Sequence, residues 1–148
     1  MRVQSTVSLD ASTDVVFPFV SDLHRYSEWM PLVHMARPDG DNAWLVELRA
    51  KVGPLARSKR LRMMRTDMTI PSSPHEDGKV VFERHETDGK KHSPWILTVH
   101  VHAVGESSRV DVDLEYQGSL WTGGLLEQVL QNNINAGKEG LKKATSQK

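Results

Sequence analysis

The sequence predicts an α+β fold, in which a curved antiparallel sheet of about six to seven strands wraps around one long C-terminal helix. Two short helices are expected after the first strand. Apolar and polar residues alternate at the start of the chain and again between turn residues throughout its middle. After Gly123–Gly124 the apolar spacing becomes helical. A run of strands followed by a helix is typical of α+β proteins rather than of α/β proteins.

The first elements are a strand and two helical segments. Apolar residues alternate with polar ones from Val3 to Leu9, which predicts a strand. From Val15 to Leu23 the apolar residues follow at helical spacing, so an amphipathic helix is expected there. Residues 24–31 hold two aromatic side chains and end in proline, which predicts one short helical turn folded back over the core.

The middle of the chain predicts strands joined by turns. The expected strands are Trp44–Lys51, a segment around Leu61–Met63, Lys79–Thr87, Pro94–Ala103 and Val110–Tyr116. Residues 70–78 are rich in Pro, Ser and Gly and predict a loop.

The last element is a helix of about 20 residues that ends near Lys142 or Lys143, where lysines suit the helix dipole. No repeat or linker interrupts the chain, so residues 1–148 are expected to form one domain.

Composition excludes several classes of protein. The formal net charge is zero over 148 residues, which argues against a general nucleic-acid binder. The chain has no cysteine, so it has no disulfide, thiolate metal site or cysteine nucleophile. It begins with no signal-peptide pattern and has no apolar run long enough to span a membrane, so a cytoplasmic location is expected.

The segment VVFPFVSDLHRYSEWMP, from Val15 to Pro31, resembles the helix-pair segment of the START-like (SRPBCC) superfamily. That superfamily includes the polyketide cyclase/dehydrase and lipid-transport group and coenzyme-Q-binding relatives. The strand-rich middle and the final helix agree with this resemblance. It implies a helix-grip fold like that of Bet v 1, with a ligand cavity between the concave face of the sheet and the last helix.

Inward-facing positions give the candidate cavity lining. The candidate ligand-binding residues are Trp29, Trp44, Met63, Phe82, Arg84, Leu97, Tyr116, Leu126, Leu130, Asn133, Ile134 and Gly137. An apolar pocket with a few polar groups is the usual design of a small-molecule site. The alternative is that these side chains fill an ordinary core.

Three polar or small positions on apolar faces are of special interest. Arg84 shares its strand face with Val80 and Phe82, so it is expected either to contact an anionic or carbonyl ligand or to pair with a glutamate. Asn133 and Gly137 interrupt the apolar stripe of the last helix. Asn133 suits a ligand contact or a bound water, and Gly137 suits close packing or room for a ligand.

Two groups of charged residues suggest surface roles. If Val104 pairs with Arg109, His102 lies opposite Asp111 and His100 opposite Asp113, which favours cross-strand charge pairing over a metal site. If Ala50 pairs with Lys59, Arg49 lies opposite Arg60. The candidate contact residues for an anionic membrane or an acidic protein are Arg49, Lys51, Lys59, Arg60 and Arg62.

Three functions remain open at this stage. The first is binding, with transport as an extension, of a lipid-like or polyketide-like hydrophobic molecule. The second is a cyclase or dehydrase that uses polar pocket residues, such as Arg84 with Tyr116 or Asn133. The third is a recruitment module that acts through the basic strands. The chain carries no recognised catalytic, nucleotide-binding or metalloprotease motif, and no cofactor or metal is expected.

Overall fold

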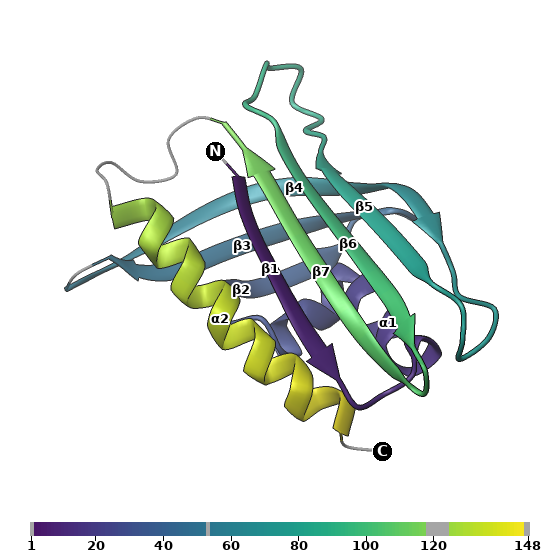
Figure 1. Ribbon diagram of the computed structural model, residues 1–148. Helices are drawn as coiled ribbons and strands as arrows, with labels where there is room; N and C mark the ends of the chain where they lie inside the picture. The colour runs from purple at the N-terminus through teal and green to yellow at the C-terminus, as the bar shows by residue number, and fades with distance from the viewer. Residues whose placement is uncertain (1, 53, 118–124, 147–148) are drawn as a thin grey trace.

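The computed structural model describes residues 2–52, 54–117 and 125–146, apart from the side chains of residues 52 and 125–130. Within these residues, seven antiparallel strands form one sheet in the order β1-β7-β6-β5-β4-β3-β2. The sheet curls so that β2, β3 and β4 lie behind β1, β7 and β6, and α2 crosses its open side (Figure 1). The predicted α+β architecture, with its curved sheet and long C-terminal helix, is confirmed.

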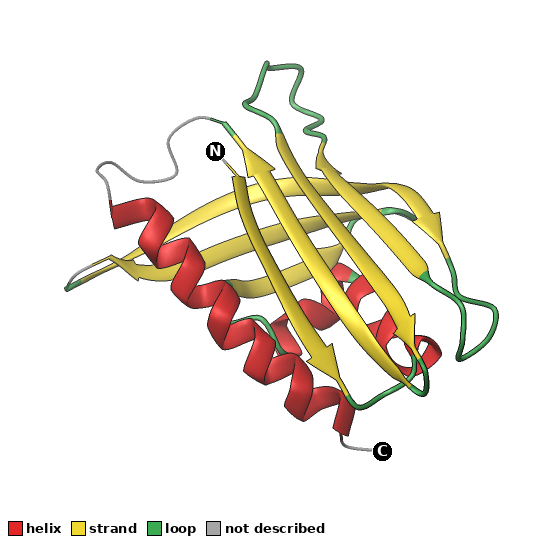
Figure 2. Cartoon of the chain, in the orientation of Figure 1, coloured by secondary structure: helices red, strands yellow, loops and turns green. Residues whose placement is uncertain are grey.

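The strands are β1 (Arg2–Leu9), β2 (Val33–Pro38), β3 (Ala43–Val52), β4 (Leu55–Thr69), β5 (Gly78–Arg84), β6 (Trp95–Val104) and β7 (Ser107–Tyr116). The helices are α1 (Thr13–Ser21), the 3₁₀ helix η1 (Leu23–Glu28) and α2 (Leu125–Ser146). Figure 2 shows α1 and η1 together within the curl of the sheet, and α2 packs against this side of the molecule. β2 had no separate prediction, and α1 ends at Ser21, so Leu23, predicted as part of the first helix, begins η1 instead.

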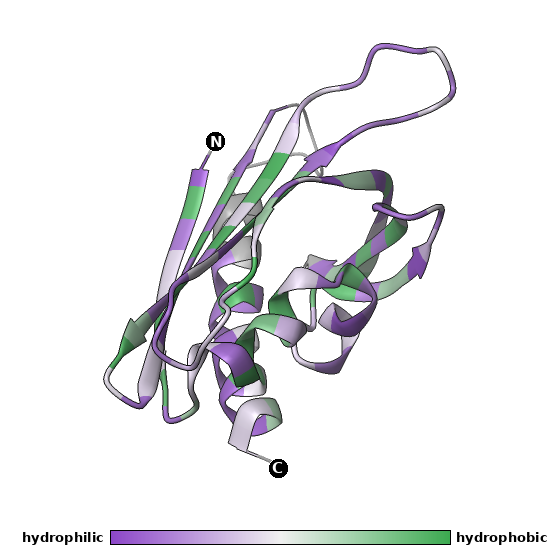
Figure 3. Cartoon of the chain, turned by 90° about the vertical axis from the view of Figure 1, so that its right-hand side faces the viewer, coloured by the Kyte–Doolittle hydropathy of each residue, from purple (hydrophilic) through white to green (hydrophobic). Residues whose placement is uncertain are grey.

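The alternation of residue type explains how β1 and β7 pair. On the inner face, Val110, Leu114 and Tyr116 are buried. On the outer face, polar side chains meet across the two strands, and Thr6 Oγ1 donates to Asp111 at 2.9 Å. Apolar and polar residues alternate in the same way along other strands (Figure 3). Strict alternation therefore selects which face of the sheet becomes the core.

Two predicted registers are wrong by two residues. In the β3–β4 hairpin Ala50 pairs with Arg57 rather than Lys59, because only residues 53 and 54 separate the strands. In the β6–β7 hairpin Val104 pairs with Ser107 rather than Arg109. A shift of two residues leaves every side chain on its predicted face, so the inward and outward assignments survive both errors.

Aromatic side chains join the helices to the sheet. The ring of Phe82 on β5 meets Tyr26 of η1 and Trp44 of β3 edge-on, at centroid distances of 6.1 and 5.6 Å. Behind η1, α2 approaches so closely that a Cβ on Gly140 would overlap the Trp29 carbonyl oxygen and lie 3.0 Å from its carbon. Glycine at this position lets the helix backbone touch the segment that follows η1.

Candidate ligand-binding cavity

An apolar cavity of about 70 Å³ lies between the two arms of the sheet, η1, the segment before β2, and α2. Its described lining residues are apolar apart from one hydroxyl and one indole N–H. They are Leu23, Tyr26, Met30, Leu32, Val33, Val46, Leu48, Leu61, Met63, Trp95, Leu97, Val112, Leu114 and Ile134. β3, β4, β6 and β7 each present two alternate residues to the cavity, and β2 adds Val33, so the strand part of the wall follows from the period-two pattern.

The wall formed by η1 is held in place by hydrogen bonds to α1. The Tyr26 hydroxyl donates to the carbonyl oxygen of Val20 at 2.7 Å. The Trp29 indole donates to the carbonyl oxygen of Phe19 at 2.9 Å. Both aromatic residues are buried, and burial raises the pKa of Tyr26 far above its ordinary value. Tyr26 is therefore a neutral structural donor in this wall.

Trp95, the first residue of β6, lines the cavity with its ring and carries a buried N–H group. Its side chain is 2% exposed and its ring packs against that of Tyr116 at a centroid distance of 4.9 Å. The indole nitrogen Nε1 is shielded from solvent and has no hydrogen-bond partner among the described residues. Buried N–H groups nearly always have a partner, so this one needs an explanation.

A second, smaller void of about 10 Å³ lies beyond Met30. Met30, Val112 and Ile134 line both spaces. The Met30 thioether packs on α2, where a Cβ added to Gly137 would lie 2.8 Å from its sulfur. Met30 is buried between α2 and the cavity, and its unbranched side chain has more rotamers than the β-branched Val112 and Ile134 that also line both spaces.

The structure brings only some of the predicted site residues to the cavity. Met63, Leu97 and Ile134 line it. Leu126 and Leu130 lie on α2, but their side chains are outside the described residues. Other predicted residues do not line the cavity. Asn133 is half-buried on α2, and Gly137 packs against the end of the Met30 side chain. Four aromatic residues are buried in the adjoining core: Trp29, Trp44, Phe82 and Tyr116.

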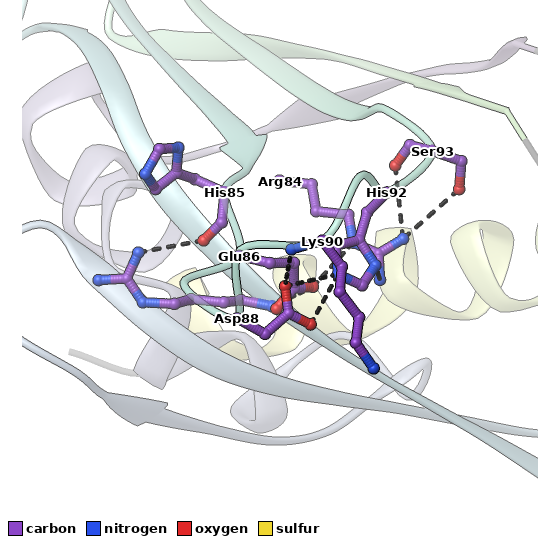
Figure 4. A network of polar contacts seen from close by, with 8 residues as sticks. Arg84, His85, Glu86, Asp88, Lys90, His92 and Ser93 are labelled. Carbon is purple, nitrogen blue, oxygen red and sulfur yellow. Dashed lines mark hydrogen bonds and ion pairs between the residues drawn. The ribbon is translucent and has the colours of Figure 1, made fainter.

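Arg84 sits next to the cavity, opposite Met63 in the β4–β5 ladder, but its guanidinium is occupied. Nε donates to Glu86 Oε2 at 2.8 Å, and the side chain is only 9% exposed. The terminal nitrogens contact Ser93 at 3.4 Å and His92 Nδ1 at 3.2 Å (Figure 4). Of the two alternatives for Arg84, the structure shows the glutamate pair.

The same network continues through the connection between β5 and β6. His92 Nε2 lies 2.8 Å from Asp88 Oδ2 (Figure 4). The backbone N–H of Lys90, and then His92, lower the pKa of Asp88. Nearby, burial and then the Arg84 guanidinium lower the pKa of Lys59. These contacts form a polar network that ties the connection between β5 and β6 to Arg84 at the end of β5.

The outer-face charges pair differently from the prediction. Arg60 lies opposite Glu47, with Nε and Oε1 3.3 Å apart, so the expected like-charge pair of Arg49 and Arg60 is wrong. Arg62 Nε contacts Asp39 Oδ2 at 2.9 Å. The other three residues of this prediction form no salt bridge in the described part of the chain: Arg49, Lys51 and Lys59.

Of the two histidines on β6, His102 pairs with acids. His102 Nε2 lies 3.1 Å from Asp111 Oδ2, although Arg109 is its partner in the ladder. Its ring stacks on His100 at 5.7 Å. Across residues 2–52, 54–117 and 125–146, no group of three or more His, Asp or Glu side chains is placed to hold a metal ion.

Comparison with known proteins decides the family. Residues 1–145 match the family described as "Polyketide cyclase / dehydrase and lipid transport". The chain belongs to this family. The family match therefore confirms the predicted resemblance to START-like proteins, which was drawn from residues 15–31. No curated protein matches the sequence.

Solved structures agree with the polyketide cyclase/dehydrase and lipid-transport family at the level of fold. A START superfamily protein from Mycobacterium smegmatis is 15% identical with a TM-score of 0.70, covering 99% of this chain and 97% of that one. The Zhui aromatase/cyclase from Streptomyces sp. R1128 is 14% identical with a TM-score of 0.67, covering 99% and 93%. A STAR-related lipid transfer protein from Xanthomonas axonopodis is 15% identical with a TM-score of 0.64, covering 99% and 86%.

Sequence reasoning missed several cavity residues of this family member. Leu23, Tyr26 and Leu32 come from η1 and the segment after it, where no period-two pattern shows which side chains face inward. Val33 begins β2, a strand that had no separate prediction. Trp95 could have been found, because it alternates with Leu97, Val99 and Val101 on one face of β6.

None of the described helices has the length and apolar content needed to cross a membrane.

Proposed function

We propose that this protein binds a compact hydrophobic molecule in the cavity between the sheet, η1 and α2. The observation that carries the proposal is an internal space with an almost entirely apolar lining. Protein interiors are normally close-packed, and an empty apolar space forfeits dispersion contacts that a guest would restore. The family description, which names lipid transport and polyketide cyclases, supports the same type of ligand.

The volume limits the size of the ligand. At about 70 Å³ the cavity is several-fold smaller than the roughly 300–1,000 Å³ of sites for drug-sized molecules. A full-length lipid or polyketide needs more room than this conformation offers. Rotation of Met30 away from Gly137 would join the two voids, so Met30 is the side chain whose movement would admit a longer guest.

The two other functions receive less support. A cyclase was expected to bring an acid/base pair to the cavity, but Tyr26 is the one titratable residue among the described lining residues, and its hydroxyl is bonded to a carbonyl. Arg84 is bonded to Glu86 instead. A recruitment module was expected to have a filled core and a salt-sensitive partner, whereas the core holds an apolar cavity. Of the five basic residues proposed for that role, Arg60 and Arg62 are paired with acids, and Arg49, Lys51 and Lys59 form no salt bridge among the described residues.

The test is a titration of the isotope-labelled protein with methylenecyclohexane, a compact hydrocarbon, followed by NMR. We expect saturable shifts of signals from the cavity residues. Leu48→Phe should abolish binding, because Leu48 lines the cavity and the larger ring would occupy it. Leu45→Phe is the matched control, since Leu45 lies on the same strand but is 37% exposed.

Two results would reject this function: no saturable shift in the unaltered protein, or equal binding by Leu48→Phe and the Leu45→Phe control. Native mass spectrometry of the freshly purified protein, followed by solvent extraction, adds an independent measurement. A co-purifying apolar molecule would support the proposal and give the natural size of the guest.

A further inference from the structure

We propose that the β3–β4 hairpin docks the protein on an anionic lipid bilayer, with the apolar tip of the hairpin inserted at the level of the headgroups. This surface lies outside the cavity, so the inference goes beyond the proposed function and does not depend on it. The described side chains of the tip are those of Pro54, Leu55 and Ala56, and all three are exposed. Leu55 is a large apolar side chain at 54% exposure.

The hairpin projects beyond the rest of the sheet. The ladder of β2 with β3 ends at Leu48, and the ladder of β5 with β4 begins at Met63. Between these two residues, the strands pair only with each other among the described residues, out to the pair of Val52 and Leu55. Figure 1 shows this two-stranded ribbon extending past the neighbouring strands. The tip can therefore reach a flat surface before the body of the protein does.

Three basic side chains surround the ribbon just behind its tip. Arg49 and Lys51 lie on one face, and Arg57 lies on the other, where it pairs with Ala50. All three are exposed, and none forms a salt bridge with a described residue. Residues 48–66 contain no acid. Arg49, Lys51 and Arg57 therefore form a cationic collar on both faces of the ribbon.

This collar is smaller than the basic surface expected from the sequence, and it lies nearer the tip. Arg60 and Arg62 are paired with Glu47 and Asp39. Lys59 is half-buried, and burial lowers the pKa of its ammonium group. Paired or buried charges attract an approaching surface weakly, so the unpaired collar is the part that an anionic partner meets.

The order of residue types along the ribbon matches the layers of a bilayer. Because a strand rises about 3.3 Å per residue, Lys51 lies about 3 Å and Arg57 about 7 Å behind the pair of Val52 and Leu55. Interfacial segments bury their apolar side chains about 5–10 Å into the boundary between headgroups and acyl chains. A tip at that depth places the collar among the lipid phosphates, which attract Lys and Arg.

The exposed leucine favours a bilayer over other anionic partners. An acidic protein or another soluble polyanion would contact the collar through its charges and leave Leu55 in water. A bilayer accommodates both parts of the hairpin, because its hydrocarbon lies beneath its anionic headgroups. The apolar tip in front of the cations therefore identifies the partner as a lipid surface.

The hairpin is continuous with the wall of the cavity. Leu48 and Leu61 lie at the base of the ribbon on its inner face, and both line the cavity. A protein docked by the tip would hold this wall toward the bilayer, where hydrophobic molecules dissolve. Docking itself needs no molecule in the cavity, so the two proposals can be tested separately.

The experiment measures binding to two kinds of vesicle by flotation: phosphatidylcholine alone, and phosphatidylcholine mixed with phosphatidylserine. Lys51→Gln/Arg57→Gln removes two charges of the collar. Leu55→Gln removes the large apolar side chain of the tip. All three positions are exposed, so the variants should fold normally, which circular dichroism checks.

Each variant has a matched control elsewhere on the surface. Lys90→Gln/Lys91→Gln makes the same change of charge in the exposed connection between β5 and β6. Val104→Gln changes the last residue of β6, which begins the turn to β7 and is 54% exposed, like Leu55. These controls separate a role of the β3–β4 hairpin from a general effect of charge or of exposed apolar surface.

We expect binding to the vesicles that contain phosphatidylserine, weak binding to phosphatidylcholine alone, and release by added salt. Lys51→Gln/Arg57→Gln should bind about 30-fold more weakly, at about fivefold for each lost cation. Leu55→Gln should bind about tenfold more weakly, because its side chain gains little from leaving water. Both controls should bind like the original protein.

A fluorescent label reports the insertion of the tip directly. The chain has no cysteine, so Leu55→Cys and Val104→Cys each carry a single site for an environment-sensitive thiol label. On addition of the anionic vesicles, we expect a blue shift of the emission from the label at Leu55→Cys and no shift from the label at Val104→Cys.

The docking role is refuted if the protein does not bind the anionic vesicles, if a hairpin variant and its control bind alike, or if both labels respond alike. Equally tight binding to poly-L-glutamate that is insensitive to Leu55→Gln would assign an acidic protein as the partner and would also reject the bilayer. The vesicle assay contains no cavity probe, so its outcome is distinguishable from failure of the proposed function.

Discussion

Replacing Gly140 by alanine tests the contact that positions α2 against the cavity wall. The new methyl group would overlap the Trp29 carbonyl oxygen and lie 3.0 Å from its carbon and 3.1 Å from its Cα, so the two backbones must separate. Alanine gains about 1 kcal/mol over glycine in a helix interior. Overpacking against a backbone that cannot rotate away costs about 3 kcal/mol, so we expect a net loss of about 2 kcal/mol.

Gly137→Ala is the matched control, one turn earlier on the same helix. Its methyl group would lie 2.8 Å from the end of the Met30 side chain, which can move aside. We expect its stability to stay within about 1 kcal/mol of the original. Urea denaturation followed by circular dichroism gives both values. The reasoning about close helix contact is refuted if Gly140→Ala is as stable as the original protein, or if the two variants behave alike.

Three further perturbations follow from single contacts. Glu86→Gln removes the charge that balances the nearly buried Arg84 guanidinium, and should lower the free energy of unfolding by about 2 kcal/mol in urea; an unchanged midpoint would contradict the pairing. Tyr26→Phe leaves a buried carbonyl without its donor and should cost about 1–2 kcal/mol, whereas a neutral effect would show that the hydrogen bond is unimportant. The backbone N–H of Ala103 donates to Asp77 at 2.7 Å, and this contact lowers the pKa of Asp77 below its ordinary value of 3.8. The ionised Asp77 therefore stabilises the fold at neutral pH. This stabilisation is lost as the pH falls below about 3.8 and through the lower pKa of the folded state. Asp77→Asn should therefore flatten the acid side of a plot of melting temperature against pH, and an unaltered slope would argue against this linkage.

The layers of the fold were predictable because residue type alternates with a clear period. A period of two assigns each strand residue to a face, and this holds when the register is wrong, as the β3–β4 hairpin shows. Met63, Leu97 and Ile134 were therefore correctly placed on the side of the cavity. The start of the final helix was likewise marked by the change of period after residue 124.

The position of the cavity along the concave face was not predictable from periodicity. Trp44 and Phe82 face inward as expected, but η1 packs Tyr26 edge-on against Phe82, so the Phe82 ring is buried in the core. The cavity lies beside Tyr26 and Trp95 instead. The partner of Arg84 was also undecided, because Glu86 meets it only after the chain turns beyond β5. Both features depend on tertiary packing between segments of different periodicity.

The pairing of the first strand of the chain with the last one has a consequence for how the protein folds. Arg2 on β1 bonds to Glu115 on β7, a separation of 113 positions, so the first strand has no sheet partner until most of the polypeptide has left the ribosome. Contacts this distant along the chain slow folding, because the loop must close before they form. We therefore expect β1 to dock late and the nascent chain to expose the inner side of β7 until it does.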